Sequence, residues 1–274
     1  MTETVDFGYE KKTTTFDKAK IVILFACGHP FTETGQRSGP SAVFDGAKQI
    51  ELYEMQIGTS PLNKGVCTLF MDGEEYLKDT LHFAKEAHSQ KKFTIYVTDN
   101  RLISSKISGL PVVELFGKTG RDLSSLNIKD NNRKTSDKES ISSSKHPTIT
   151  AGVRAATSGA FSDTKRTVTI ITAKNLKDDK AILKSSLKSI KTPVHLCIDI
   201  DVFSPGVIQN SRSIEPGGLD WYDVTEIMDI VAEGPGIASI DITGTEAVLP
   251  NSPAAVLCAQ MVLRSTALFN TGDK

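Results

Sequence analysis

The chain has 274 residues, of which 39% are apolar, enough to build one large hydrophobic core. Its 32 Lys and Arg residues almost balance its 33 Asp and Glu residues, so charge gives no reason to expect nucleic acid or an anionic membrane as a partner. The four cysteines form no Cys-x-x-Cys pair, which argues against a zinc or disulfide framework. No segment has the length and apolar character of a membrane span, and we expect a cytoplasmic protein.

In chain order, short apolar runs alternate with segments of helical spacing. The runs rich in β-branched and aliphatic residues predict buried strands at 20–26, 93–97, 111–116, 168–172, 194–200 and 237–242. Helices are predicted at 74–89, 178–190, 221–232 and 252–268. This alternation indicates an α/β fold, a three-layer α/β/α sandwich with a mainly parallel central sheet. We expect a single domain at 20–270, preceded by an N-terminal extension at 1–19.

One segment does not fit this pattern. Residues 127–145 are almost wholly polar and rich in Ser and charged side chains. Such a composition cannot bury enough apolar surface to order itself, which predicts a mobile surface insertion at about 121–147. A role as a phosphorylation target is an alternative to simple disorder.

The carboxyl ends of the predicted strands are where a functional site is expected in such a sheet. There, Asp199 and Asp201 follow the apolar run 194–198. Two carboxylates at this place are suited to holding a hard cation or an ionised base. The alternative is that they only cap the loop and the element that follows.

The Asp-Ile-Asp strand end at 199–201 is followed by a Glu-Pro-Gly-Gly-Leu loop at 215–219 and a predicted helix. This combination resembles the arginase/agmatinase (ureohydrolase) family. The segment 35–40 is similar to the family's Gly-x-Arg-x-Gly-Pro loop, the segment 152–154 to its Gly-x-Arg strand end, and Asp241 to the Asp of its penultimate strand. The resemblance runs from about residue 20 to about residue 268 and implies the arginase-like fold.

The resemblance also implies a site with two manganese ions, which hold and ionise a bridging water. The family supplies six His and Asp ligands from three strand ends, and most of the matching positions here carry other residues. Asp199 and Asp201 are retained. The remaining vestigial metal-site positions are Asn100, Arg101, Phe116, Lys118, Gly120 and Ser204. A guanidinium has no free lone pair for a metal, and Phe and Gly side chains have no donor atom at all.

Two consequences of these substitutions are open. Arg101 and Lys118 place positive charge near the former metal positions, so they are predicted to form ion pairs with Asp199 and Asp201. The alternative is a relocated single-metal site, made by these two aspartates and either His29 or His146. His195 is predicted to be a core or surface residue, not a ligand.

The leading interpretation is a non-catalytic arginase-like protein, a pseudoenzyme with a structural, regulatory or ligand-binding role and no cofactor. The resemblance places Gly244 where the family has its catalytic Glu, and Glu246 lies two residues later. Arg154, Glu215 and Glu246 are candidate cleft residues, although Arg154 and Glu215 fit a loop-stabilising role equally well. The alternative function is a divergent metal-dependent hydrolase of linear amidines or guanidines, with manganese as cofactor. The resemblance further implies a homo-oligomer, a trimer or hexamer, or a hetero-oligomer with an active paralogue.

Overall fold

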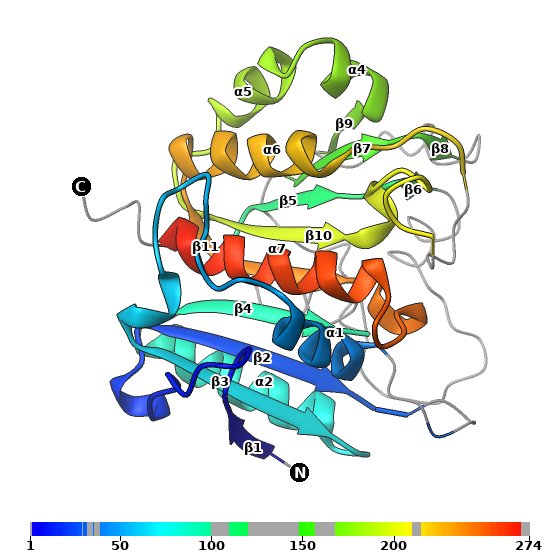
Figure 1. Cartoon of the computed structure of the whole chain (residues 1–274). Helices are drawn as coiled ribbons and strands as arrows, with labels where there is room; N and C mark the ends of the chain where they lie inside the picture. Colours follow the sequence, from blue (N-terminus) through cyan, green and yellow to red (C-terminus); the bar gives the residue numbers. More distant parts are fainter. Residues whose placement is uncertain are drawn as a thin grey trace, which may run out of the picture.

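A computed structural model describes residues 2–28, 30, 31, 35, 39–99, 110–119, 148–156, 168–209 and 215–269 (Figure 1). Within these ranges lies one nine-stranded sheet with the order β1-β3-β2-β4-β11-β10-β5-β7-β9. Its strands are β1 (Thr2–Val5), β2 (Ile21–Cys27), β3 (Val66–Asp72), β4 (Phe93–Thr98), β5 (Val112–Leu115), β7 (Thr148–Val153), β9 (Val168–Thr172), β10 (Val194–Asp199) and β11 (Ile237–Thr243). Neighbouring strands are parallel except for β1, which pairs antiparallel with β3.

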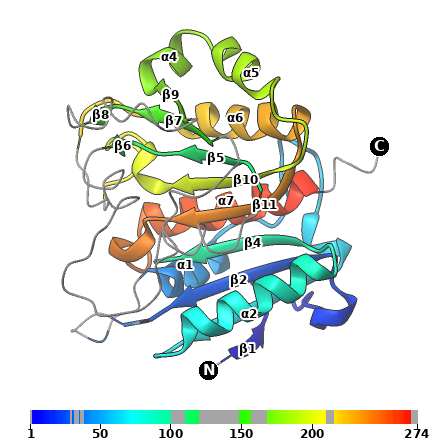
Figure 2. The same cartoon turned by 180° about the vertical axis from the view of Figure 1, so that it is seen from behind.

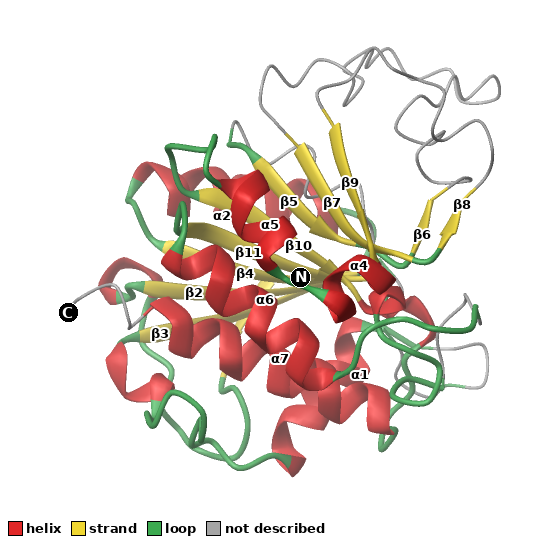
Figure 3. Cartoon of the chain, turned by 90° about the horizontal axis from the view of Figure 1, so that it is seen from above, coloured by secondary structure: helices red, strands yellow, loops and turns green. Residues whose placement is uncertain are grey.

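Helices cover both faces of this sheet. The α-helices are α1 (Pro40–Gly46), α2 (Tyr76–Ser89), α4 (Ala173–Asp178), α5 (Ala181–Leu187), α6 (Trp221–Glu233) and α7 (Pro253–Phe269). Helices α1, α6 and α7 lie on one face (Figure 1), and α2 lies on the other (Figure 2). Figure 3 shows the layers from above, with α4 and α5 beside the β9 end of the sheet. The predicted three-layer α/β/α sandwich is confirmed.

Shorter elements connect these layers. The 3-10 turns are η1 (Phe16–Lys18), η2 (Ala47–Gln49), η3 (Pro61–Lys64), η7 (Ile200–Val202) and η8 (Thr245–Ala247). Strands β6 (Lys118–Thr119) and β8 (Ala155–Ala156) form a separate parallel pair beyond the carboxyl ends of β5 and β7.

The apolar core accounts for the strand predictions. Every residue of β2 is buried, as its unbroken apolar sequence predicts for a central parallel strand. The six predicted strands are all present, with ends that differ by at most one residue, within the usual uncertainty of strand ends.

Other elements were not predicted as such. The segment expected to be one helix at 178–190 is two helices, because Asp179 between α4 and α5 has an extended backbone. Helix α1 and strands β1 and β3 were not predicted, and β7 was seen only as a strand end. The segment 1–19, expected to be an extension, adds β1 to the edge of the sheet and buries Phe7 in the core.

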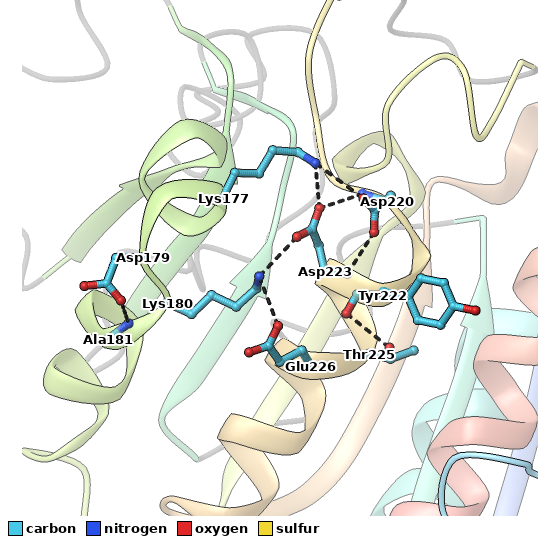
Figure 4. A network of polar contacts seen from close by, with 9 residues as sticks. All are labelled: Lys177, Asp179, Lys180, Ala181, Asp220, Tyr222, Asp223, Thr225 and Glu226. Carbon is cyan, nitrogen blue, oxygen red and sulfur yellow. Dashed lines mark hydrogen bonds and ion pairs between the residues drawn. The ribbon is translucent and has the colours of Figure 1, made fainter.

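Lysines from the α4–α5 region hold the start of α6 (Figure 4). Asp220 and Asp223 form a reciprocal capping box, each accepting a hydrogen bond from the other's backbone N–H. Lys177 Nζ lies 2.8 Å from Asp223, and Lys180 Nζ bridges Asp223 and Glu226 at 3.1 Å each. Burial alone would raise the pKa of Asp223, but hydrogen bonds from Lys177, Asp220 and Lys180 lower it to about 2.

Among the helices that the structure describes, none combines the length and the hydropathy needed to cross a bilayer.

Candidate functional site

The candidate site lies at one edge of the sheet, where the carboxyl ends of β4, β11, β10, β5 and β7 lie side by side. The arrowheads of β4, β10 and β5 point the same way in Figure 1. Because these strands are parallel, the residues that follow each of them gather at this edge. The edge therefore brings together residues that are far apart in sequence.

Asp199 and Asp201 lie at the end of β10, both inaccessible or nearly so to solvent. Asp199 Oδ1 accepts a hydrogen bond from the backbone N–H of Asp201 at 2.8 Å and caps the 3-10 turn η7. The sequence left open that the two aspartates only cap the element that follows. One carboxylate oxygen of Asp199 has this capping role. Both carboxylates remain close to the functional edge.

Arg154 follows β7 and connects the strand-end loops. Its Nε donates a hydrogen bond to the backbone carbonyl of Glu215 at 3.1 Å, and its Nη1 donates to the backbone carbonyl of Asp201. Burial lowers the pKa of Arg154, while the nearby charges of Asp201, Glu215 and Asp199 act in the opposite direction. Arg154 thus places a positive charge beside the two aspartates, and its contacts are those of a residue that braces the loops.

The segment after β5 passes directly against the end of β10. A Cβ atom on Gly117 would lie 2.0 Å from the carbonyl oxygen of Asp201, so a side chain has no space there. The backbone N–H of Phe116 donates to the carbonyl of Ala151 at 2.8 Å. The Phe116 side chain offers no donor to a metal, and only the backbone of Lys118 is described, within β6.

Gly244 closes the site from the side of β11. Its φ is +76°, in the left-handed region, and a Cβ atom there would lie 2.6 Å from Asp199 Oδ1. A glutamate at this position would therefore require Asp199 or the backbone to move. Glu246 lies in η8, which Thr245 joins to β4 through a 3.0 Å hydrogen bond from its hydroxyl to the carbonyl of Thr98.

Asp99, directly after β4, is a candidate residue that the sequence did not single out. Its Oδ2 accepts a hydrogen bond from the backbone N–H of Gly28 at 3.3 Å. Burial raises the pKa of Asp99; hydrogen bonds from Gly28 and Tyr76 oppose this, and the charge of Glu246 adds to it. The only available signal was its place after a buried strand, which Asn100 and Arg101 share.

The loop that carries Glu215 pairs with the chain after β10. The backbone N–H of Ser204 donates to the carbonyl of Leu219 at 2.8 Å, and Leu219 N–H donates to Val202 at 3.0 Å. Gly218 lies so close that a Cβ atom there would be 2.8 Å from the nitrogen of Ser204, and its φ is +101°. Gly218 of the Glu-Pro-Gly-Gly-Leu loop therefore permits a close backbone approach.

Several predicted positions lie outside the described residues. These are Asn100, Arg101 and Gly120 of the vestigial metal site, the two histidines of the relocated site, His29 and His146, and the insertion at about 121–147. The predicted ion pairs of Arg101 and Lys118 with the aspartates stay predictions.

His195 lies in the core, one of the two places that the sequence left open for it. Its side chain is fully buried, and Nδ1 lies 2.8 Å from the hydroxyl of Ser239 in β11. Burial lowers the pKa of His195 to about 4, so the imidazole is neutral at physiological pH.

The side chains that the structure describes at this edge do not supply the donors of a two-manganese centre. Within the described ranges, no three His, Cys, Asp or Glu side chains lie where they could hold one metal ion. Two hard cations need several oxygen or imidazole donors each. Phe116 has no donor atom in its side chain, and the resemblance places Asn, Arg, Lys and Gly at other ligand positions. Asp199 and Asp201 are the two donors retained.

Comparisons with known proteins agree with this architecture. The arginase family model matches residues 133–267. An N(1)-aminopropylagmatine ureohydrolase of Synechocystis is 24% identical over 214 residues, which cover 69% of this chain and 68% of that protein. A protein of the same name from Thermococcus kodakarensis is 30% identical over 79 residues, which span 29% of this chain and only 27% of that relative.

Solved structures extend the likeness over nearly the whole chain. The agmatine ureohydrolase of Thermoplasma volcanium has a TM-score of 0.71 and 14% identity, covering 96% of this chain and 95% of that one. A Trypanosoma cruzi formiminoglutamase solved with Mn²⁺ has a TM-score of 0.70 and 12% identity, covering 97% of both chains. At such identities the likeness establishes the fold.

The chain therefore has the α/β fold of the solved agmatine ureohydrolase and formiminoglutamase structures. The match of residues 133–267 to the arginase family model agrees with this fold.

Proposed function

We propose that this protein acts on, or binds without turnover, a linear amidine or guanidine at the carboxyl edge of the sheet. The proposal rests on the buried pair Asp199 and Asp201 at the carboxyl end of β10. The carboxyl ends of the strands are where α/β sheets form their ligand sites. Carboxylates suit a cationic amidine or guanidine as well as a metal ion.

Hydrolysis of the C–N bond is the version that the relatives support better. Both sequence relatives described above are named ureohydrolases, and the structural neighbours are named agmatine ureohydrolase and formiminoglutamase. Such chemistry relies on a metal to ionise the attacking water. In this chain it would need a metal arrangement other than the family's, with Asp199 and Asp201 as the retained ligands.

Binding without turnover is the second candidate, and the side chains favour it. Gly244 takes the place of the expected catalytic Glu, and its approach to Asp199 leaves no space for a longer side chain. Phe116 takes the place of a ligand Asp. A protein with these changes would serve as a structural, regulatory or ligand-binding member of the family, as a homo-oligomer or as a partner of an active paralogue.

One experiment separates the two. The full chain is dialysed with excess Mn²⁺, its metal content is measured by elemental analysis, and urea release is followed with arginine and agmatine. About one or two equivalents of metal with turnover would establish the hydrolase, provided that Asp199→Asn and Asp201→Asn abolish both. Less than roughly a tenth of an equivalent and no urea would overturn the metal-dependent guanidine hydrolase and favour binding without turnover.

A further inference from the structure

A surface pocket of about 120 Å³ lies at the opposite edge of the sheet from the candidate functional site. It is formed between the turn after β1 and the segment that leads through η3 into β3. Because β3 begins just after η3, this pocket lies at the amino end of that strand. The residues lining it are Tyr9, Glu10, Lys12, Glu51, Leu52, Tyr53, Ser60 and Leu62.

The lining combines an apolar base with two tyrosines. Leu52 and Leu62 are buried, whereas Tyr9 and Tyr53 are 55% and 48% exposed. The face of a tyrosine ring attracts a cation through a cation–π interaction.

The charge of the pocket is negative. Lys12 is paired with Glu10, so these two charges offset each other. Glu51 accepts a hydrogen bond from the hydroxyl of Tyr9 at 3.2 Å, and within the described part of the chain it forms no ion pair with Lys or Arg. One carboxylate charge is therefore left beside the two aromatic rings.

The wall that carries Tyr53 is fixed from the protein interior. The neighbouring Glu54, 7% exposed, forms an ion pair of 3.1 Å with Arg264 of α7, which is 1% exposed. Glu54 also accepts hydrogen bonds from the backbone N–H groups of Ile57, through its side chain, and Gly58, through its carbonyl. The pocket is thus largely formed before any ligand arrives, which lowers the entropy cost of binding.

We propose that this pocket binds an organic cation, an alkylated ammonium group held against Tyr9 and Tyr53 with its charge facing Glu51. The apolar base accommodates the alkyl groups, and the carboxylate supplies the countercharge. This site is independent of the function proposed for the carboxyl edge.

The test uses choline and its uncharged isostere 3,3-dimethylbutan-1-ol, titrated into the full chain and followed by NMR. Choline is expected to bind with a Kd on the order of 1–10 mM, and the isostere at least about tenfold more weakly. Tyr53→Leu and Glu51→Gln are each expected to weaken choline binding about three- to tenfold. Glu74→Gln, which removes an exposed carboxylate elsewhere, is the matched control and should leave binding unchanged.

Equal binding of the isostere, or unchanged affinity in Tyr53→Leu and Glu51→Gln, would overturn the proposal. So would the absence of saturable choline binding up to about 50 mM. Tyr53→Phe keeps the ring and should retain most of the affinity, which separates a cation–ring contact from general loss of the wall. This test measures choline binding and not urea release. Its result is therefore independent of the test of the carboxyl-edge site.

Discussion

The two faces of the same central strands differ sharply in chemistry. Toward α6 and α7, β10 and β11 present Leu196, Ile198, Ile240 and Ile242, all fully buried. The alternate residues of the same strands face the α2 side of the sheet, because successive side chains of a strand point to opposite faces. There β11 carries Ser239 and Asp241, and β10 carries His195 and Cys197.

The strand register extends this polar row across five strands. Asp241 pairs with Tyr96 and with Cys197, Cys197 pairs with Glu114, and Glu114 pairs with Thr150. A covered parallel sheet normally has apolar residues on both faces. Between β4 and β7, one face of the sheet is therefore apolar, while the other carries titratable groups whose burial costs stability unless they are hydrogen-bonded.

The largest expected effect comes from the apolar face. Leu196→Ala removes a fully buried side chain from a central strand and leaves a cavity under the helices. The free energy of unfolding should fall by about 2–5 kcal/mol, measured by urea denaturation. Leu249→Ala makes the same change at a residue that is 38% exposed and should cost far less. Equal losses in the two variants would show that β10 is not part of the main core.

On the polar face, His195 makes stability depend on pH. Burial lowers its folded pKa to about 4, below the unfolded value near 6.5, so the unfolded state binds the proton first as pH falls. Its contribution is fully present above about pH 6.5 and is lost as pH falls toward 4, with a slope of up to about 1.4 kcal/mol per pH unit.

Urea denaturation between pH 7 and pH 4 measures this effect in the wild type and in His195→Asn. The difference in unfolding free energy between the wild type and His195→Asn should change across this pH window. The variant His82→Asn, at a side chain that is 70% exposed, should follow the wild type. Parallel pH profiles for the wild type and His195→Asn would mean that His195 is not held neutral in the fold.

The difference between the two faces explains which strands could be predicted from the sequence. Unbroken apolar runs such as 21–27 identified the central strands, because both faces of those strands are covered by apolar groups. β7 reads TITAGV, in which Thr alternates with apolar residues, and its polar half belongs to the polar row. An apolar-run criterion therefore could not find it, and only the resemblance of its Gly-x-Arg end pointed there.

In the candidate site, too, some residues could be placed from the sequence and some contacts could not. Asp199 and Asp201 could be placed from the strand that precedes them, and the structure does put them at the carboxyl edge. The contacts of Arg154 with the carbonyls of Asp201 and Glu215 join three loops far apart in sequence, so no local pattern could reveal them. The requirement for glycine at 117 arises from the approach of β10, which is also a tertiary contact.

The smallest expected effect isolates one hydrogen bond of the polar row. The hydroxyl of Thr150 donates to Glu114 Oε2 at 3.2 Å, with Thr150 buried. Thr150→Val keeps the shape of the side chain but removes this donor, and the free energy of unfolding should fall by about 1 kcal/mol. Thr169→Val makes the same change at an exposed residue of the adjacent edge strand β9 and should be neutral or slightly stabilising. If both variants were equally stable, the polar row would not depend on hydrogen bonds between its members, and its groups would have to be satisfied from outside the sheet.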